Sequence, residues 1–267
     1  MPPIQPLLQS YYRVLLETLR QGLEEPGCPI CNILADGTRR GFSYFLDEGV
    51  LDPEMRVRLI ESNGWCPRHT LLLLTVEREQ HPDHLGSATV YESLLEAVQR
   101  RLDEARREVR KSVSPPSARR RRQNVRRVVD SFLPRSQCPA CDSEAQREDA
   151  EAGFLVETLF DPELGPELKQ LYENSEGLCY RHLIGCLRRC ASPEQAAELL
   201  DLERPKWRLL AAEVVDYARK HEHRYHQEPF GDEIDAWARA ARKLAGHWPT
   251  GPNLERLIAV TRKRETR

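Results

Sequence analysis

Apolar residues recur every three or four positions along most of the chain, which is the period of an amphipathic helix. One such segment runs from Ile4 to Leu23. Another, from His84 to Lys111, is stricter, and six of its side chains follow a heptad seam: Tyr91, Leu95, Val98, Leu102, Ala105 and Val109. We expect one long helix there, with its seam against the same chain or a second copy. No stretch shows the two-residue alternation of a strand, so the pattern predicts an all-α fold.

The helical pattern stops at "SPPSARRRR", from Ser114 to Arg122. Prolines and small polar residues end helices, and a run of arginines favours solvent over a core. We therefore expect a linker over residues 113–123. It divides an N-terminal part, residues 1–112, from a C-terminal part, residues 124–267.

The sequence after the linker repeats the sequence before it. Gly41-Phe42 corresponds to Gly153-Phe154, and the Asp-Pro-Glu at Asp52 corresponds to the one at Asp161. Asp-Pro-Glu is a typical helix start, because Asp caps the helix and Pro suits its first position. We therefore expect a duplicated helical module.

Further helices are expected after the second repeat. Ser192-Pro193-Glu194-Gln195 has the form of a capping box, and Pro205 is expected to interrupt the helix that follows. A later helix should stop at Gly246, and Pro252 suits the start of a last short one.

Composition narrows the class of protein. Hydrophobic residues make up 40% of the 267, and the net charge of −2 gives no overall field for nucleic acid or membranes. The N-terminal stretch has no basic region followed by a continuous apolar run, and the longest apolar run, Leu71 to Val76, is too short to span a bilayer. We expect a cytoplasmic protein without membrane contact, in which cysteines serve as metal ligands or free thiols rather than disulfides.

Each repeat contains a Cys-Pro-x-Cys motif and, further on, a Cys-x-x-His motif. Three thiolates and one imidazole complete the tetrahedral shell of a structural Zn²⁺ site. We therefore expect two zinc ions, each held within one repeat. The first set is Cys28, Cys31, Cys66 and His69, and the second is Cys138, Cys141, Cys179 and His182.

Other interpretations of these residues remain open. A thioredoxin-type redox pair would need a βαβ context, and ordinary buried cysteines would leave the two histidines unexplained. An iron–sulfur cluster is chemically possible. Arg68 and Arg181, each beside a ligand histidine, could offset the net negative charge of a Cys3His zinc site or could be solvated.

Three other groups carry weaker indications. Cys186 and Cys190 lie one helical turn apart and suit either a core or a redox role near a metal. His221, His223 and His226 lie close together and suit either a solvated helix end or a further metal site. Between Arg100 and Arg127 there are twelve Lys and Arg residues against three Asp and Glu. Six arginines of that stretch are candidates for phosphate contacts: Arg119, Arg120, Arg121, Arg122, Arg126 and Arg127.

The paired motifs resemble those of an uncharacterised prokaryotic family with a domain of unknown function. The resemblance rests on "CPIC … GWCPRH", "LGSATVYESLLEAV", "CPAC … GLCYRH" and "EPFGDEIDAWARAARKLAG", and it extends from about Cys28 to Gly246. It implies the duplication, the eight metal ligands and a bacterial or archaeal origin. It implies no activity.

The sequence contains no nucleophile paired with a base, no phosphate-binding loop and no dinucleotide fingerprint. We therefore expect two duplicated zinc-stapled helical modules, joined by a long helix and a linker and followed by C-terminal helices. A non-enzymatic interaction or regulatory protein with a protein partner is the first hypothesis, and a homo-oligomer is possible. The alternatives are a nucleic-acid-binding protein that uses Arg119–Arg127, and a thiol or zinc redox sensor or metal-dependent enzyme.

Overall fold

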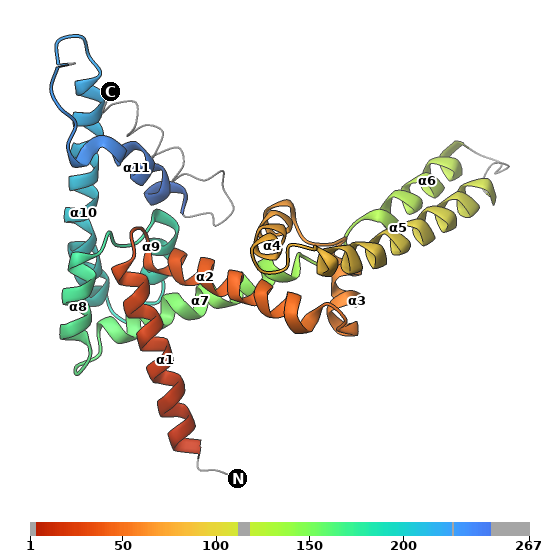
Figure 1. Ribbon diagram of the computed structural model, residues 1–267, viewed down its shortest axis with the longest axis horizontal. Helices are drawn as coiled ribbons and strands as arrows, with labels where there is room; N and C mark the ends of the chain where they lie inside the picture. Colours follow the sequence, from red (N-terminus) through yellow and green to blue (C-terminus); the bar gives the residue numbers. More distant parts are fainter. Residues whose placement is uncertain (1–3, 112–117, 226, 247–267) are drawn as a thin grey trace. The chain divides into compact units, whose positions relative to one another are not determined.

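The computed structural model describes residues 4–111, 118–225 and 227–246, and all regular structure in these ranges is helical (Figure 1). This confirms the expected all-α fold. The α-helices are α1 (Ile4–Glu24), α2 (Pro29–Tyr44), α3 (Pro53–Glu61), α4 (Pro67–Gln80), α5 (Leu85–Lys111), α6 (Ala118–Phe132), α7 (Pro139–Leu159), α8 (Gly165–Asn174), α9 (Tyr180–Leu187), α10 (Pro193–Lys220) and α11 (Ala236–Ala245). A π-helical turn, η1 (Phe45–Gly49), follows α2, and a 3₁₀ turn, η2 (Asp232–Asp235), precedes α11.

Several helix ends lie where the sequence predicts them. The Asp52 side chain accepts a hydrogen bond from the backbone N–H of Glu54 at the start of α3. Ser192 likewise caps α10 through the N–H of Gln195. Gly246 ends α11 with a φ of 82°, a conformation that favours glycine. The short helix expected at Pro252 lies outside the described residues.

Two local predictions are wrong. The carboxylate of Asp161 accepts hydrogen bonds from the N–H groups of Glu163 and Leu164, but this closes a turn, and α8 begins only at Gly165. Pro205 does not interrupt α10, which continues from Pro193 to Lys220. Pro205 is exposed, so water can satisfy the backbone carbonyl that loses its partner.

The chain forms two compact units, and they differ from the sequential parts that the linker suggests. The first unit comprises residues 1–37 and 146–267, and the second comprises residues 38–145. The boundaries fall inside α2 and α7, so each of these helices begins in one unit and ends in the other. Each unit therefore combines segments from both repeats.

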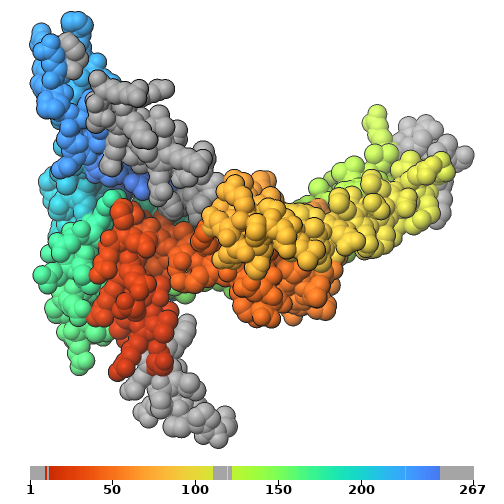
Figure 2. Space-filling view, viewed as in Figure 1, coloured from red at the N-terminus to blue at the C-terminus, as the bar shows by residue number. Residues whose placement is uncertain are grey.

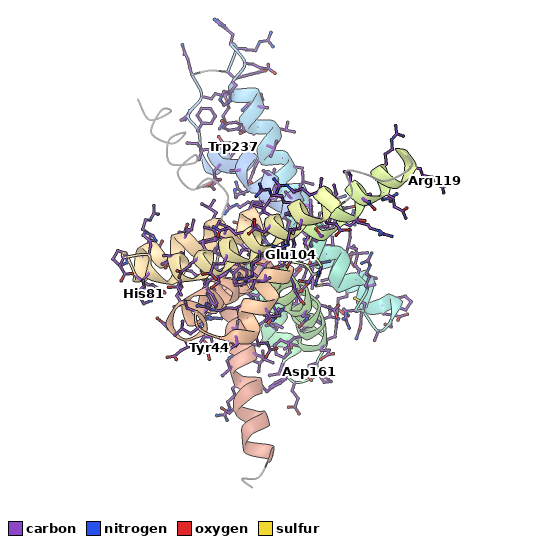
Figure 3. All side chains as sticks on the ribbon, turned by 90° about the vertical axis from the view of Figure 1, so that its right-hand side faces the viewer. Tyr44, His81, Glu104, Arg119, Asp161 and Trp237 are labelled. Carbon is purple, nitrogen blue, oxygen red and sulfur yellow. The ribbon has the colours of Figure 1, made fainter. Side chains whose placement is uncertain are left out.

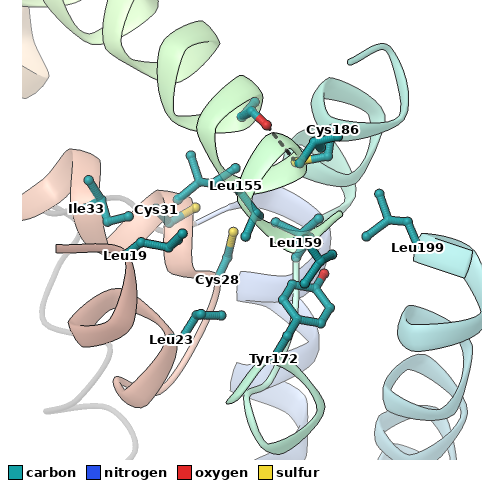
Figure 4. Close-up of a cluster of buried hydrophobic side chains, with 14 of the residues drawn as sticks. Leu19, Leu23, Cys28, Cys31, Ile33, Leu155, Leu159, Tyr172, Cys186 and Leu199 are labelled. Carbon is teal, nitrogen blue, oxygen red and sulfur yellow. Dashed lines mark hydrogen bonds between the residues drawn. The ribbon is translucent and has the colours of Figure 1, made fainter. Parts of the chain in front are cut away.

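The core of the first unit surrounds one of the cysteine groups. Leu19 of α1, Ile30 of α2, and Leu155 and Leu159 of α7 are almost completely buried, together with Tyr172 of α8. Figure 4 shows Cys28 and Cys31 among these side chains. The thiols thus lie in apolar surroundings, which exclude water from any ion they hold.

The core of the second unit is smaller. It contains Phe42 of α2, Phe45 at the start of η1, Leu73 and Val76 of α4, and Leu59 of α3. Trp65 packs edge-on against both phenylalanines, at ring-centroid distances of 5.1 and 5.7 Å. This aromatic cluster lies directly before Cys66.

The second unit also contains a hairpin formed by α5 and α6, which lie side by side (Figure 1). The long helix predicted from His84 to Lys111 is therefore confirmed as α5. Residues 113–117 of the expected linker lie outside the described residues. The remainder of that linker, residues 118–123, forms the start of α6, so the arginine run at Arg119 is helical and not a loop.

Candidate metal centres

All four Cys-x-x-Cys and Cys-x-x-His motifs adopt the same local structure. In each, the first cysteine is the residue before a helix, and its carbonyl accepts the first intrahelical hydrogen bond: Asn32 to Cys28, Thr70 to Cys66, Asp142 to Cys138 and Leu183 to Cys179. The second ligand lies three residues later, in the first turn, on the same helix face. The Cys-Pro-x-Cys motifs begin α2 and α7, because proline suits the first helical position.

The first site consists of Cys28 and Cys31 at the start of α2 and Cys179 and His182 at the start of α9. The Nδ1 atom of His182 lies 3.2, 3.3 and 3.3 Å from the sulfurs of Cys28, Cys31 and Cys179. The sulfurs of Cys31 and Cys179 are 3.8 Å apart. All four side chains are buried.

The second site consists of Cys66 and His69 at the start of α4 and Cys138 and Cys141 at the start of α7. The Nδ1 atom of His69 lies 3.3, 3.4 and 3.4 Å from the three sulfurs. The sulfurs of Cys66 and Cys141 are 3.7 Å apart. His69 is fully buried, but the three cysteines are partly exposed, so this site is the more open of the two.

The structure brings together all eight predicted residues, but the expected pairing within each repeat is wrong. Each Cys-Pro-x-Cys motif meets the Cys-x-x-His motif of the other repeat. The reason lies in helix length. Between Cys31 and Cys66 the chain forms α2, whose 16 residues extend over roughly 24 Å at 1.5 Å per residue. This helix leads away from the first site into the second unit, and α7 leads from the second site into the first.

The geometry of both groups fits a tetrahedral metal ion. Sulfurs bound at ~2.3 Å to one tetrahedral Zn²⁺ are roughly 3.8 Å apart, and the observed separations are 3.8 and 3.7 Å. Each site also lies at two helix N-termini, whose dipoles and free N–H groups stabilise thiolates. Two Cys3His groups that could each hold a metal ion are thus part of this fold.

A carboxylate supports the histidine of each site. The Nε2 atom of His182 lies 3.2 Å from Glu148, and the Nε2 atom of His69 lies 3.0 Å from Glu144. At this distance the negative charge of a carboxylate attracts a proton to Nε2, which favours the tautomer that leaves Nδ1 free for a metal. Both glutamates belong to α7, and with Cys141 they form an i, i+3, i+7 row on that helix. That row is the sequence signal by which they could have been found.

The two arginines expected near the sites contact these carboxylates. The Nε atom of Arg181 lies 2.6 Å from Glu148, and Arg68 forms an ion pair with Glu144. Each arginine therefore orients the carboxylate that orients the ligand histidine. This is a more indirect role than the direct charge compensation considered from the sequence.

The pKa values of His69 and Glu144 in the second site reflect these contacts. Burial opposes charge on His69, but Cys138 and Glu144 outweigh it and raise the His69 pKa to about 9. Burial also opposes charge on Glu144, yet His69 and Arg68 lower its pKa to about 2. A bound cation would replace the protons on the thiols and on Nδ1, because metal ligands must be deprotonated.

A buried carboxylate stabilises the segment that leads into Cys179. Glu203 of α10 accepts hydrogen bonds from the Tyr172 hydroxyl at 2.5 Å and the Leu178 N–H at 2.8 Å. It also lies 3.3 Å from the ammonium group of Lys243 in α11. These contacts connect α8, α10 and α11 to Leu178, the residue before Cys179.

Gly246, directly after α11, lies against the first site. A Cβ atom at this position would be 3.7 Å from the Cys31 sulfur and 3.8 Å from the Cys179 sulfur. The end of the C-terminal helix α11 therefore covers two of the thiols. The sequence indicated Gly246 only as a helix end.

Cys186 and Cys190 do not join either site. Cys186 is fully buried in the core of the first unit, where burial raises the pKa of its thiol, and its sulfur lies 4.0 Å from the Ala152 carbonyl (Figure 4). Cys190 contacts the carbonyl of Cys186 at 3.5 Å. These positions agree with the core interpretation of both cysteines.

The histidine cluster is described only in part. His221 is the C-terminal cap of α10, and its Nδ1 atom lies 2.8 Å from the Tyr217 carbonyl. His223 is exposed, and His226 lies outside the described residues. The metal site considered there stays a prediction.

Within the described ranges, none of the helices is both long enough and apolar enough to cross a membrane.

Comparison with known proteins identifies relatives but no activity. The chain is 25% identical over 227 residues to an "Uncharacterized 23.9 kDa protein in xynA 3'region" from Caldicellulosiruptor sp. (strain Rt8B.4), a match that covers 85% of this chain and 98% of that protein. No solved structure matches. The model of a family described as "Family of unknown function (DUF6062)" matches residues 18–251, and the chain belongs to this family.

Proposed function

We propose that the protein is a zinc-binding interaction or regulatory protein in which two Cys3His sites are structural. The observation that carries this proposal is the number of converging ligands. In each site three sulfurs and one imidazole nitrogen lie within 4.8 Å of one another, which completes a tetrahedral shell. A catalytic zinc site keeps one position for water or substrate, with three protein ligands.

The zinc ions would act as cross-links between distant segments. In the first site an ion would join α2 to α9, and in the second it would join α4 to α7. A structural Zn²⁺ contributes on the order of 10 kcal/mol to folding. Several of the joined elements are short, such as the 8-residue α9, and such helices are weak in isolation. The metal would therefore maintain the surface on which a partner binds.

Metal analysis combined with circular dichroism tests this proposal. The purified protein should contain two zinc ions per chain, and a strong chelator should lower both the helical signal and the melting temperature. Because the cysteines of the second site are partly exposed, its zinc should leave first. Iron in place of zinc, or unchanged helicity after complete metal removal, would contradict the proposal. Restoring zinc to the chelated protein controls for irreversible damage.

The basic segment supports nucleic-acid binding as a second candidate function. Arg119, Arg122, Arg126 and Arg127 are exposed on α6, and Figure 3 shows Arg119 projecting from the hairpin. Replacing these four arginines by Gln should weaken binding to duplex DNA or RNA and reduce its salt dependence. Arg204→Gln with Arg208→Gln, on the exposed face of α10, is the matched control. Absence of salt-sensitive binding by the unmodified protein would exclude this candidate.

A further inference from the structure

The α5–α6 hairpin has a contact row on each helix where the two helices meet. On α5 the less exposed positions are Ala97, Arg101 and Ala105, and on α6 they are Asn124, Val128 and Phe132. The two helices run antiparallel and lie side by side (Figure 1), so these less exposed rows are the ones that face one another. They therefore form the inner face of the hairpin.

The exposed apolar residues directly follow these inner positions in sequence. Val98 follows Ala97 and Leu102 follows Arg101 on α5. Each inner residue of α6 is likewise followed by one member of an apolar row, Val125, Val129 and Leu133, the last of which lies directly after the helix. One residue corresponds to a rotation of 100° about a helix axis. The two inner rows face one another, and the helices run in opposite directions. A rotation of 100° along each chain therefore turns from both inner rows toward the same side of the hairpin. The hairpin therefore has one continuous apolar face.

This face contains most of the heptad seam and is not covered by the rest of the described chain. Leu95, Leu102 and Leu133 are 61%, 53% and 56% exposed. Figure 2 shows the surface of α5 in yellow along the hairpin. Together the seven residues (these three with Val98, Val109, Val125 and Val129) expose roughly 600 Å², at the upper end of what a typical monomer leaves in water. Such a face indicates an interaction surface.

The charges beside the face change sign along the hairpin. On the outer flank of α5, Glu92 and Glu96 lie toward the base, and Arg106 and Arg110 lie toward the tip. On α6, Asp130 lies toward the base, and Arg119 and Arg122 lie toward the tip. On the outer flank of α5, the base is thus acidic and the tip basic. An antiparallel copy of the same hairpin would place its basic tip beside this acidic base.

We propose that two copies of the protein dimerise through this face, with their hairpins antiparallel in a four-helix bundle. A two-fold axis near Leu102 brings Leu102 of both copies together and pairs Leu95 of each with Val109 of the other. The same axis brings Glu92 and Glu96 of one copy beside Arg106 and Arg110 of the other. A two-fold interface uses the same patch on both partners, and here the apolar residues and the charges on the outer flank of α5 are self-complementary. In the proposed interaction role, this dimer would make a second copy of the chain the binding partner. The dimer proposal itself does not depend on that role.

Charge-reversal variants test the antiparallel arrangement. The base variant carries Glu92→Arg and Glu96→Arg, and the tip variant carries Arg106→Glu and Arg110→Glu. Each variant alone should place like charges together and dissociate at least about tenfold more readily than the unmodified protein. An equimolar mixture should restore dimers, because the reversed base of one then meets the reversed tip of the other. All four residues are exposed, so circular dichroism should show intact folding.

The readout is mass in solution from light scattering and sedimentation. The unmodified protein should have about twice the 30.9 kDa mass of one chain, and Leu102→Glu should be monomeric. A monomeric unmodified protein at micromolar concentrations would overturn the proposal, and so would a mixture that stays monomeric. A monomer that instead binds an acidic helical peptide or a nucleic acid through the hairpin would assign the face to another partner. Zinc content, measured on the same samples, separates failure of this proposal from failure of the metal sites.

Discussion

The sulfur of Cys31 lies 3.8 Å from the sulfur of Cys179, although 148 positions separate the two residues. Cys31 belongs to the first repeat and Cys179 to the second, so the duplicated motifs complete each other's sites. Each site takes two ligands from one repeat and two from the other, so neither repeat alone contains all four ligands of a site. The two metal centres therefore depend on the fold of the whole chain, because each unit is built from both repeats.

The carboxylates of Glu148 and Glu144 should each affect one metal site. Glu148→Ala should weaken zinc binding at the first site by about 10- to 100-fold, because His182 loses the group that holds the proton on Nε2. Glu144→Ala should weaken the second site to a similar extent. Titration against a chromophoric chelator measures both affinities. Glu157→Ala, an exposed position on α7, should change neither. An equal loss at both sites in either variant would contradict these assignments.

Glu203 should be important for the stability of the first unit. Glu203→Ala leaves the buried Lys243 ammonium group without its carboxylate and the N–H of Leu178 without its acceptor, and should cost about 3–5 kcal/mol of unfolding free energy. Tyr172→Phe removes one hydrogen bond to the same carboxylate and should cost about 1–1.5 kcal/mol. Urea denaturation with saturating zinc measures both, with Asp201→Ala, exposed on α10, as the control. A cost below that of Asp201→Ala would show that the network does not stabilise the fold.

Cys186 should be dispensable for metal binding and unreactive toward oxidants. It is fully buried, and burial raises the pKa of its thiol, so little of the reactive thiolate forms. Cys186→Ala should retain two zinc ions and lose about 1 kcal/mol of stability. Cys179→Ala, the comparison variant, should lose the zinc of the first site. Peroxide-dependent zinc release that disappears in Cys186→Ala would instead support a redox role.

The sequence predicts the ligands better than it predicts their pairing. Cys28, Cys31 and the other six residues stand out because their motifs occur twice, and the all-α fold follows from three- and four-residue periodicity. The four motifs can be combined into two Cys3His sites in two ways, and local sequence does not distinguish them. The choice depends on where α2 and α7 lead, which is a property of the tertiary structure. Pro205 is a second example of a feature that depends on tertiary structure. The helix continues through it because the position is exposed, and that exposure is not given by the local sequence.

The most direct test of the exchanged pairing is the zinc content of two double variants after equilibration with a competing chelator. Cys31→Ala with Cys179→Ala removes two ligands from one site, so one zinc ion per chain should remain. Cys31→Ala with Cys66→Ala removes one ligand from each site, so no chelator-resistant zinc should remain. The reverse result, no zinc in the first variant and one ion in the second, would show that each repeat binds its own metal and would contradict the account.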